Sequence, residues 1–436
     1  MKILIKEIPK SKKEIEIEVP KEEFQKFYQI SLEELSKDVE IQGFRKGNAP
    51  KGVVEEKIGK ERILSEATQK VIELNYFKAV KENNLEVLGE PKIEITNTSP
   101  EEPLKFKATV SVMPKVLLPE YEKIVKNVKK KKVEVSEKEL DDNLKYLRRS
   151  KAKFTLKTEP SENGDWIEID YTIKEKDKDM SPSYKDSFIL GEGKLVKGFE
   201  EKIVGMKGGE EKDFQLFVDK KMAENLSRSV NSSGSSKEET SFHVKMKSVQ
   251  NMELPSLDDN FAQGLRIPGF KEEGFENINA LKQTLESNIA RQKESEEVQR
   301  HRREMLEKIA EKSEIDIPDI LIEEQKKKYL ENMKKEISEK LSMDFKGYLE
   351  KIKKTEEDIL KSFEDPSRSQ VKISLILREI QEKEKVEVSE EEVEEEMKKV
   401  MKDYQGKEED VDREQLRGYT KEVIKQEKTF KLLEQF

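Results

Sequence analysis

The sequence has no cysteine, only two histidines and a single tryptophan. Without cysteine there can be no disulfide bonds or thiolate metal sites, and this composition suits a reducing compartment. The histidines, His243 and His301, lie too far apart in the sequence to predict a metal site. No Ser-His-Asp set or nucleophilic cysteine can be proposed, so the sequence gives hydrolase chemistry little support.

Apolar residues are also scarce, at 33% of the chain. No stretch reaches the roughly 18 to 20 apolar residues that a membrane-spanning helix needs. The first residues, Met1 to Glu7, lack the apolar core and cleavage site of a signal peptide. We therefore expect a soluble, cytoplasmic protein with no membrane partner.

Charged residues make up 41% of the 436 residues, and the net charge is -9. A chain of this length predicts several domains, and the high charge is typical of long solvated helices with narrow apolar stripes. The negative net charge disfavours DNA as a partner, so any contact with RNA must come from a local basic segment.

The first part of the chain predicts a small α+β domain over residues 1–115. Apolar residues alternate at Ile15, Ile17 and Val19, which indicates a strand, and alternation returns between Leu104 and Val112. Between these strands the apolar spacing is helical, first at Phe24, Phe27, Tyr28, Leu32 and Leu35 and then at Ile63, Leu64, Ala67, Val71 and Leu74. Residues 116–150, with helical spacing at Leu140, Leu144 and Leu147, are expected to form linker helices.

A mostly β domain is predicted over residues 151–249. A turn at Asn163-Gly164-Asp165 leads into alternation from Ile167 to Ile173, and glycines cluster between Gly191 and Gly209. Alternation closes the domain at Phe242, Val244 and Met246.

Residues 250–436 are predicted to be all-helical. Asn277 can cap a helix long enough to project as an arm, and Pro318 is expected to start the next helix. Ser389 and Glu392 form a capping-box pattern before an acidic helix. Sustained heptads would point to a coiled-coil adaptor, but Pro318 and Pro366 break the helices.

The loop from Gly43 to Pro50 combines glycines with Phe44, Arg45 and Lys46. The two cations can pair with phosphates or carboxylates while the aromatic ring stacks or anchors, which is a mixture expected at an RNA-protein surface. The alternative is an ordinary loop between helices in which Phe44 folds back onto the core.

This loop resembles the signature Gly-Phe-Arg-x-Gly-Lys-x-Pro of bacterial trigger factors, except that Asn48 stands where lysine is usual. The resemblance implies that residues 1–115 dock on the large ribosomal subunit near the exit tunnel, with Phe44, Arg45 and Lys46 contacting protein and rRNA. The partners it implies are the ribosome and nascent or unfolded polypeptides, and it allows a homodimer away from the ribosome.

The glycine-rich segment from Gly191 to Glu210 has neither the spacing of a P-loop nor that of a dinucleotide fingerprint, so no ATP or other cofactor is expected. It is similar to FKBP-like prolyl isomerases, in its Gly-Asp strand start, Leu-Gly turn, Gly-Phe-Glu helix start and Gly-Met-x-x-Gly-Glu turn. That similarity implies a β domain with one short helix, and catalysis without a metal. The implied site residues are Tyr171, Leu195, Val196, Phe199 and Phe242, all of types that any small β domain would also bury.

One departure affects the expected rate of isomerisation. Lys221 stands where FKBP-like domains usually place a pocket tyrosine, which favours a slower or specialised enzyme.

Residues 254–262 and 315–322 resemble trigger factor junction and arm segments, implying an extended, all-α chaperone domain with arms. Two functions remain open from the residues. One is an ATP-independent chaperone that docks on the ribosome and carries an isomerase. The other is a free-standing prolyl isomerase or holdase without docking.

Overall fold

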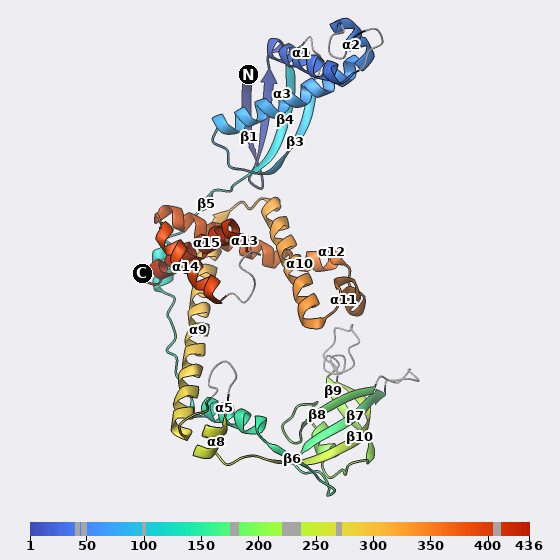
Figure 1. Cartoon of the computed structure of the whole chain (residues 1–436), viewed down its shortest axis with the longest axis vertical. Helices are drawn as coiled ribbons and strands as arrows, with labels where there is room; N and C mark the ends of the chain where they lie inside the picture. The colour runs from blue at the N-terminus through green and yellow to red at the C-terminus, as the bar shows by residue number, and fades with distance from the viewer. Residues whose placement is uncertain are drawn as a thin grey trace. The chain divides into compact units, whose positions relative to one another are not determined.

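The computed structural model describes residues 1–39, 44, 50–97, 102–174, 183–219, 237–266, 273–403 and 411–436. The chain divides into two compact units, one made of residues 1–129 and 300–436 and the other of residues 130–299. Among the described residues, no helix is long and apolar enough to cross a membrane. Figure 1 shows the chain and labels most of its helices and strands.

The first unit begins with a four-stranded antiparallel sheet in the order β1-β2-β4-β3. Ile15, Ile17 and Val19 point inward from β2 at alternate positions, and helix α3 packs on them through Ala67 and Val71. The predicted strand and helix periodicities therefore meet in one core. The elements are β1 (Lys2–Ile8), β2 (Lys12–Val19), α1 (Lys21–Asp38), α2 (Lys51–Ile58), α3 (Lys60–Glu82), β3 (Val87–Asn97) and β4 (Leu104–Val112).

Helices form the rest of the first unit, together with a small pairing of β5 with β11. Tyr121, Ile309 and Ile376 are completely buried in its core, where the last helix adds Phe430 and Leu433. The elements are β5 (Val116–Leu117), α4 (Tyr121–Lys126), β11 (Glu314–Ile315), α10 (Asp319–Leu341), α11 (Phe345–Ile352), α12 (Glu356–Ser362), α13 (Glu364–Lys383), α14 (Glu390–Asp403) and α15 (Arg413–Leu433).

A five-stranded sheet and one short helix form most of the second unit. The strand order is β6-β10-β7-β8, and β9 also pairs with β10. The inward positions Ile167, Ile169 and Val244 are at most 1% exposed. The elements are β6 (Lys153–Leu156), β7 (Trp166–Lys174), β8 (Ser183–Ile189), α6 (Phe199–Ile203), β9 (Glu211–Asp219) and β10 (Lys237–Glu253).

The second unit also contains α5 (Glu137–Ser150), α8 (Asp259–Gly264) and the first part of α9 (Ile278–Lys312). The 35 residues of α9 correspond to a rod of about 52 Å. As predicted, the Asn277 side chain caps this helix, accepting a hydrogen bond from the Ala280 backbone N–H at 2.9 Å. The structure thus confirms the multidomain architecture with a strand-rich central part and a helical C-terminal part.

Candidate functional site

Three elements bring the predicted isomerase residues together. Strand β7 carries Tyr171, strand β10 carries Phe242, and helix α6 begins at Phe199. Gly198, directly before this helix, has φ of 86°, a left-handed conformation that side chains rarely adopt. A Cβ atom at Gly198 would also lie 3.4 Å from the Leu216 side chain. Glycine at this position therefore sets the direction in which Phe199 enters the core.

The Phe199 ring is the centre of the aromatic cluster. Its centroid lies 5.2 Å from that of Phe214, 5.3 Å from that of Phe242 and 5.8 Å from that of Tyr171, all in edge-to-face geometry. Tyr171 in turn stacks on Tyr184 at 5.4 Å. Edge-to-face pairs place the positive edge of one ring against the negative face of another, which fixes the ring orientations.

Water is largely excluded from this cluster. Phe199 and Phe242 are each 1% exposed, Tyr171 is 5% and Val196 is 6% exposed, and Leu195 packs on them from a half-buried position. Burial raises the pKa of Tyr171, so its hydroxyl stays neutral. A dry apolar environment suits rotation about an X-Pro bond, because the twisted imide is less polarised than the planar one.

Glu200 has a role that the sequence did not indicate. Its carboxylate, 7% exposed, accepts backbone hydrogen bonds from Gly191, Gly193, Lys194 and Leu195 at 2.7, 3.1, 2.6 and 3.4 Å, respectively. One side chain at the start of α6 therefore shapes the whole loop that carries Leu195. The only signal in the sequence was the Gly-Phe-Glu motif, which does not indicate the groups to which Glu200 bonds.

The base of the predicted docking loop is held by bonds between α1 and α2. The Tyr28 hydroxyl donates to Glu55 at 2.6 Å, and Lys51 donates to Glu33 at 2.9 Å. Burial, followed by the bond to Glu55, raises the pKa of Tyr28 to about 12. These bonds join α1 to α2 on the side from which the loop extends.

Phe44, in the docking loop, is 45% exposed. It therefore does not fold back into the core, which was the alternative for this residue. Arg45, Lys46 and Asn48 lie outside the described residues, as does Lys221 of the isomerase domain.

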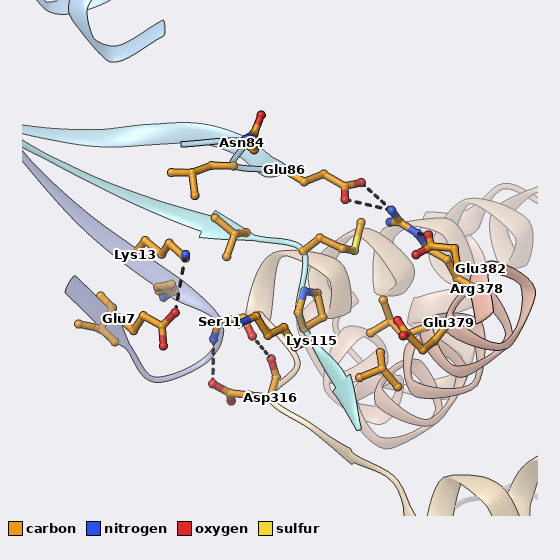
Figure 2. Close-up of a pocket in the computed structure, with 18 residues that line it drawn as sticks. Glu7, Ser11, Lys13, Asn84, Glu86, Lys115, Asp316, Arg378, Glu379 and Glu382 are labelled. Atoms are coloured by element: carbon orange, nitrogen blue, oxygen red, sulfur yellow. Dashed lines mark hydrogen bonds and ion pairs between the residues drawn. The ribbon is translucent and has the colours of Figure 1, made fainter. Parts of the chain in front are cut away.

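A separate cavity of about 490 Å³ lies where the sheet of the first unit meets its helices (Figure 2). At one side the Ser11 backbone N–H donates to the Asp316 carboxylate at 2.8 Å. At the other, Arg378 donates to both carboxylate oxygens of Glu86 at 2.9 and 3.0 Å. None of the predicted site residues lines this cavity. Its lining contains both acidic and basic side chains, which suits contacts that hold the sheet to the helices.

Comparison with known proteins extends over nearly the whole chain. Residues 1–147 match a model of the bacterial trigger factor protein, residues 277–435 match its C-terminus, and residues 157–247 match FKBP-type peptidyl-prolyl cis-trans isomerase. The trigger factor of Carboxydothermus hydrogenoformans is 31% identical over 409 residues, covering 93% of this chain and 91% of that protein. The chain belongs to the trigger factor family.

A second relative and a solved structure agree with this assignment. The trigger factor of Caldicellulosiruptor saccharolyticus is 30% identical over 395 residues, covering 89% of this chain and 85% of that protein. A solved trigger factor chaperone, studied for promiscuous substrate recognition in folding and assembly, aligns with a TM-score of 0.54 over 100% of this chain and 99% of that one. At 20% identity, this structural likeness shows the shared fold alone.

Family membership confirms the main functional prediction. A trigger factor is a chaperone that binds ribosomes and nascent chains, and this one includes an FKBP-type prolyl isomerase domain. The comparisons support this function over the free-standing isomerase.

Proposed function

We propose that this chaperone docks beside the exit tunnel of the large ribosomal subunit through Phe44, Arg45 and Lys46, which contact ribosomal protein and rRNA. The exposed Phe44 side chain carries this proposal, because an aromatic ring that its own core does not bury can anchor in an apolar pocket of a partner. The adjacent cations would pair with phosphate or carboxylate. In this proposal the protein acts in the cytoplasm, without ATP, and can form a homodimer when it is not on the ribosome.

Cosedimentation with ribosomes tests the docking. The triple variant with alanine at residues 44, 45 and 46 should lose most binding and keep its fold, because loop tips contribute little packing. A matched control replaces exposed Phe77, Lys78 and Lys81 of α3 with alanine. Equal binding by wild type and the loop variant would rule the proposal out.

The proposal extends to the prolyl isomerase site, whose surface consists of Tyr171, Leu195, Val196, Phe199 and Phe242. It also places the domain boundaries at residues 115, 150 and 249. The cluster geometry supports this site, since the residues converge from β7, α6 and β10 in one buried aromatic cluster. Isomerisation should be slower than in FKBP-like domains that have a tyrosine at the position of Lys221.

Proline-limited refolding of a model substrate tests the isomerase site with the full chain. Phe199→Leu keeps an apolar side chain but removes the central ring, so it should lower kcat/KM at least about tenfold, the cost of a lost transition-state contact of about 1.4 kcal/mol. Phe154→Ala, at a phenylalanine 44% exposed on β6 and outside the cluster, should leave the rate unchanged. If wild type gives no acceleration, the domain is a client-binding module instead.

A further inference from the structure

Asp186 places a carboxylate on the inward face of the isomerase sheet. Strand β8 is at the edge of this sheet and pairs with β7 in antiparallel register, so residues directly opposite each other point to the same face. The inward positions of β8 are Tyr184 opposite Tyr171, Asp186 opposite Ile169, and Phe188 opposite Ile167. Asp186 therefore lies between two aromatic residues in a row that otherwise faces the apolar core.

The two oxygens of this carboxylate differ in their partners. The Oδ1 atom of Asp186 accepts hydrogen bonds from Lys194 Nζ at 2.8 Å and from the Ser187 backbone N–H at 2.9 Å. Among the described residues, no hydrogen bond or ion pair involves its Oδ2 atom. The side chain is 27% exposed, so a ligand can reach this acceptor. Because the Lys194 ammonium already offsets the negative charge, a neutral donor suits Oδ2 better than a second cation.

Asp186 lies beside two residues of the proposed isomerase site. Lys194, its ion-pair partner, directly precedes Leu195 in the loop that Glu200 holds. Burial, followed by the charge of Asp186, raises the pKa of Tyr171, so the carboxylate also acts on this second site residue. The acceptor is therefore located at the exposed margin of the aromatic cluster, next to the surface that a bound peptide would contact.

A prolyl peptide has a donor that such a margin must satisfy. Proline has no backbone N–H, so the residue that follows proline supplies the nearest donor on that side of the ring. Removing this N–H from water costs free energy unless an acceptor in the protein replaces the water. The phenylalanine and aliphatic side chains of the cluster contain no acceptor, whereas the Asp186 carboxylate beside them does.

We propose that Asp186 binds the substrate by accepting a hydrogen bond from the backbone N–H of the residue that follows proline. This inference rests on the proposed isomerase site and adds a substrate-binding residue to it. Rotation about the X-Pro bond turns the residue before proline relative to the ring, while the residue after proline keeps its position. The hydrogen bond to Asp186 is therefore equally strong before and during rotation, so it lowers KM and leaves kcat unchanged.

The test compares two versions of the peptide Ala-Leu-Pro-Phe with the full chain. In the second version an ester oxygen replaces the N–H of the phenylalanine, which removes the proposed donor and keeps the side chains. Exchange measured by NMR at several peptide concentrations gives kcat and KM for catalysed isomerisation. Wild type should show a kcat/KM about tenfold higher for the amide than for the ester, because one hydrogen bond to a charged, partly exposed group is lost.

Two variants separate substrate binding from support of the loop. Asp186→Ala should raise KM for the amide about tenfold, leave kcat unchanged and remove the preference for the amide over the ester. Lys194→Ala removes the ion pair but retains the acceptor, so it should keep that preference. The urea midpoint from Trp166 fluorescence shows whether each variant is folded, because this tryptophan begins β7 of the same domain.

The outcomes distinguish this inference from the proposed site on which it rests. A preference for the amide that persists in Asp186→Ala would overturn the inference. Equal losses of activity in Asp186→Ala and Lys194→Ala on both peptides would also overturn it, since the ion pair would then only support the loop. In either case the proposed site stands if wild type accelerates isomerisation and Phe199→Leu reduces it. No acceleration by wild type on either peptide would refute the proposed site itself.

Discussion

Replacing Glu200 with alanine should destabilise the isomerase domain and impair catalysis together. The Glu200 carboxylate accepts four backbone hydrogen bonds from the segment Gly191 to Leu195, and among the described residues no other side chain bonds to those four N–H groups. Glu200→Ala removes all four acceptor contacts at once. The loop would then no longer hold Leu195 against the aromatic cluster.

The expected cost follows from the geometry. A hydrogen bond to a charged group contributes about 1.5 to 3 kcal/mol. Only the bonds from Gly191 and Lys194, at 2.7 and 2.6 Å, are short, and the loop residues are partly open to water that can replace a lost partner. We therefore expect about 3 kcal/mol for Glu200→Ala and about half of that for Glu200→Gln, which retains one oxygen acceptor.

The single tryptophan makes the measurement specific to this domain. Trp166 begins β7, so its fluorescence during urea unfolding reports on the isomerase domain within the full chain. With a urea m-value of about 1.5 kcal/mol/M, 3 kcal/mol moves the midpoint by about 2 M. The control is Glu201→Ala, at the exposed neighbouring glutamate. A midpoint shift for Glu200→Ala no larger than that of the control would refute the role of Glu200.

Three further predictions concern the helices and the connection to the sheet. Arg302 is half-buried between two glutamates and stacks on a phenylalanine of α15. Replacing Arg302 with alanine should therefore cost about 2 kcal/mol, less than for a fully buried pair, and should accelerate amide exchange in α15. Replacing the exposed Arg303 with alanine should have little effect. The hydrogen bond from Lys293, followed by those from the helix cap, lowers the pKa of Glu139 from 4.5 to about 2. The stabilisation from ionised Glu139 is thus complete above pH 4.5 and is lost as the pH falls towards 2. At neutral pH the wild type should melt at a higher temperature than Glu139→Gln, and this difference should disappear as the pH falls from 4.5 to 2. Asp316→Ala should accelerate amide exchange at the turn between β1 and β2, because Asp316 accepts a hydrogen bond there; unchanged exchange would show that this contact contributes no protection.

Local signals in the sequence predicted helix boundaries well. Asn277 and Ser389 both cap helices through their side chains, and the Glu392 carboxylate completes the capping box by accepting a hydrogen bond from the Ser389 N–H at 2.8 Å. These bonds join residues three positions apart, so the chain determines them without reference to the rest of the fold. The same pattern at Ser136 and Glu139 also forms a capping box, which the helical spacing around Leu140 had not revealed.

Contacts between distant segments could not be predicted in the same way. Resemblance indicated Phe199 and Phe242 for the isomerase site, but Phe214 joins them only because β9 pairs with β10, with Phe214 opposite Phe242. Ser11 and Asp316 are 305 positions apart, and no pattern in either segment indicates the other. Such contacts depend on topology, which periodicity within one segment does not specify.

Exposed aromatic residues show most clearly why sequence patterns and binding surfaces differ. Phe24 and Phe77 both lie on helices of the N-terminal domain, yet the first is completely buried and the second is 62% exposed. Leu74 continues the apolar spacing of α3 but is 38% exposed, since the apolar arc of this helix is wider than the sheet face it covers. Periodicity shows that an apolar residue lies on one face of a helix, but only the packing shows whether that residue is buried in the protein's core. Phe77 belongs to the part of that arc left exposed and lines a groove beside β3, which is why periodicity alone could not reveal this groove.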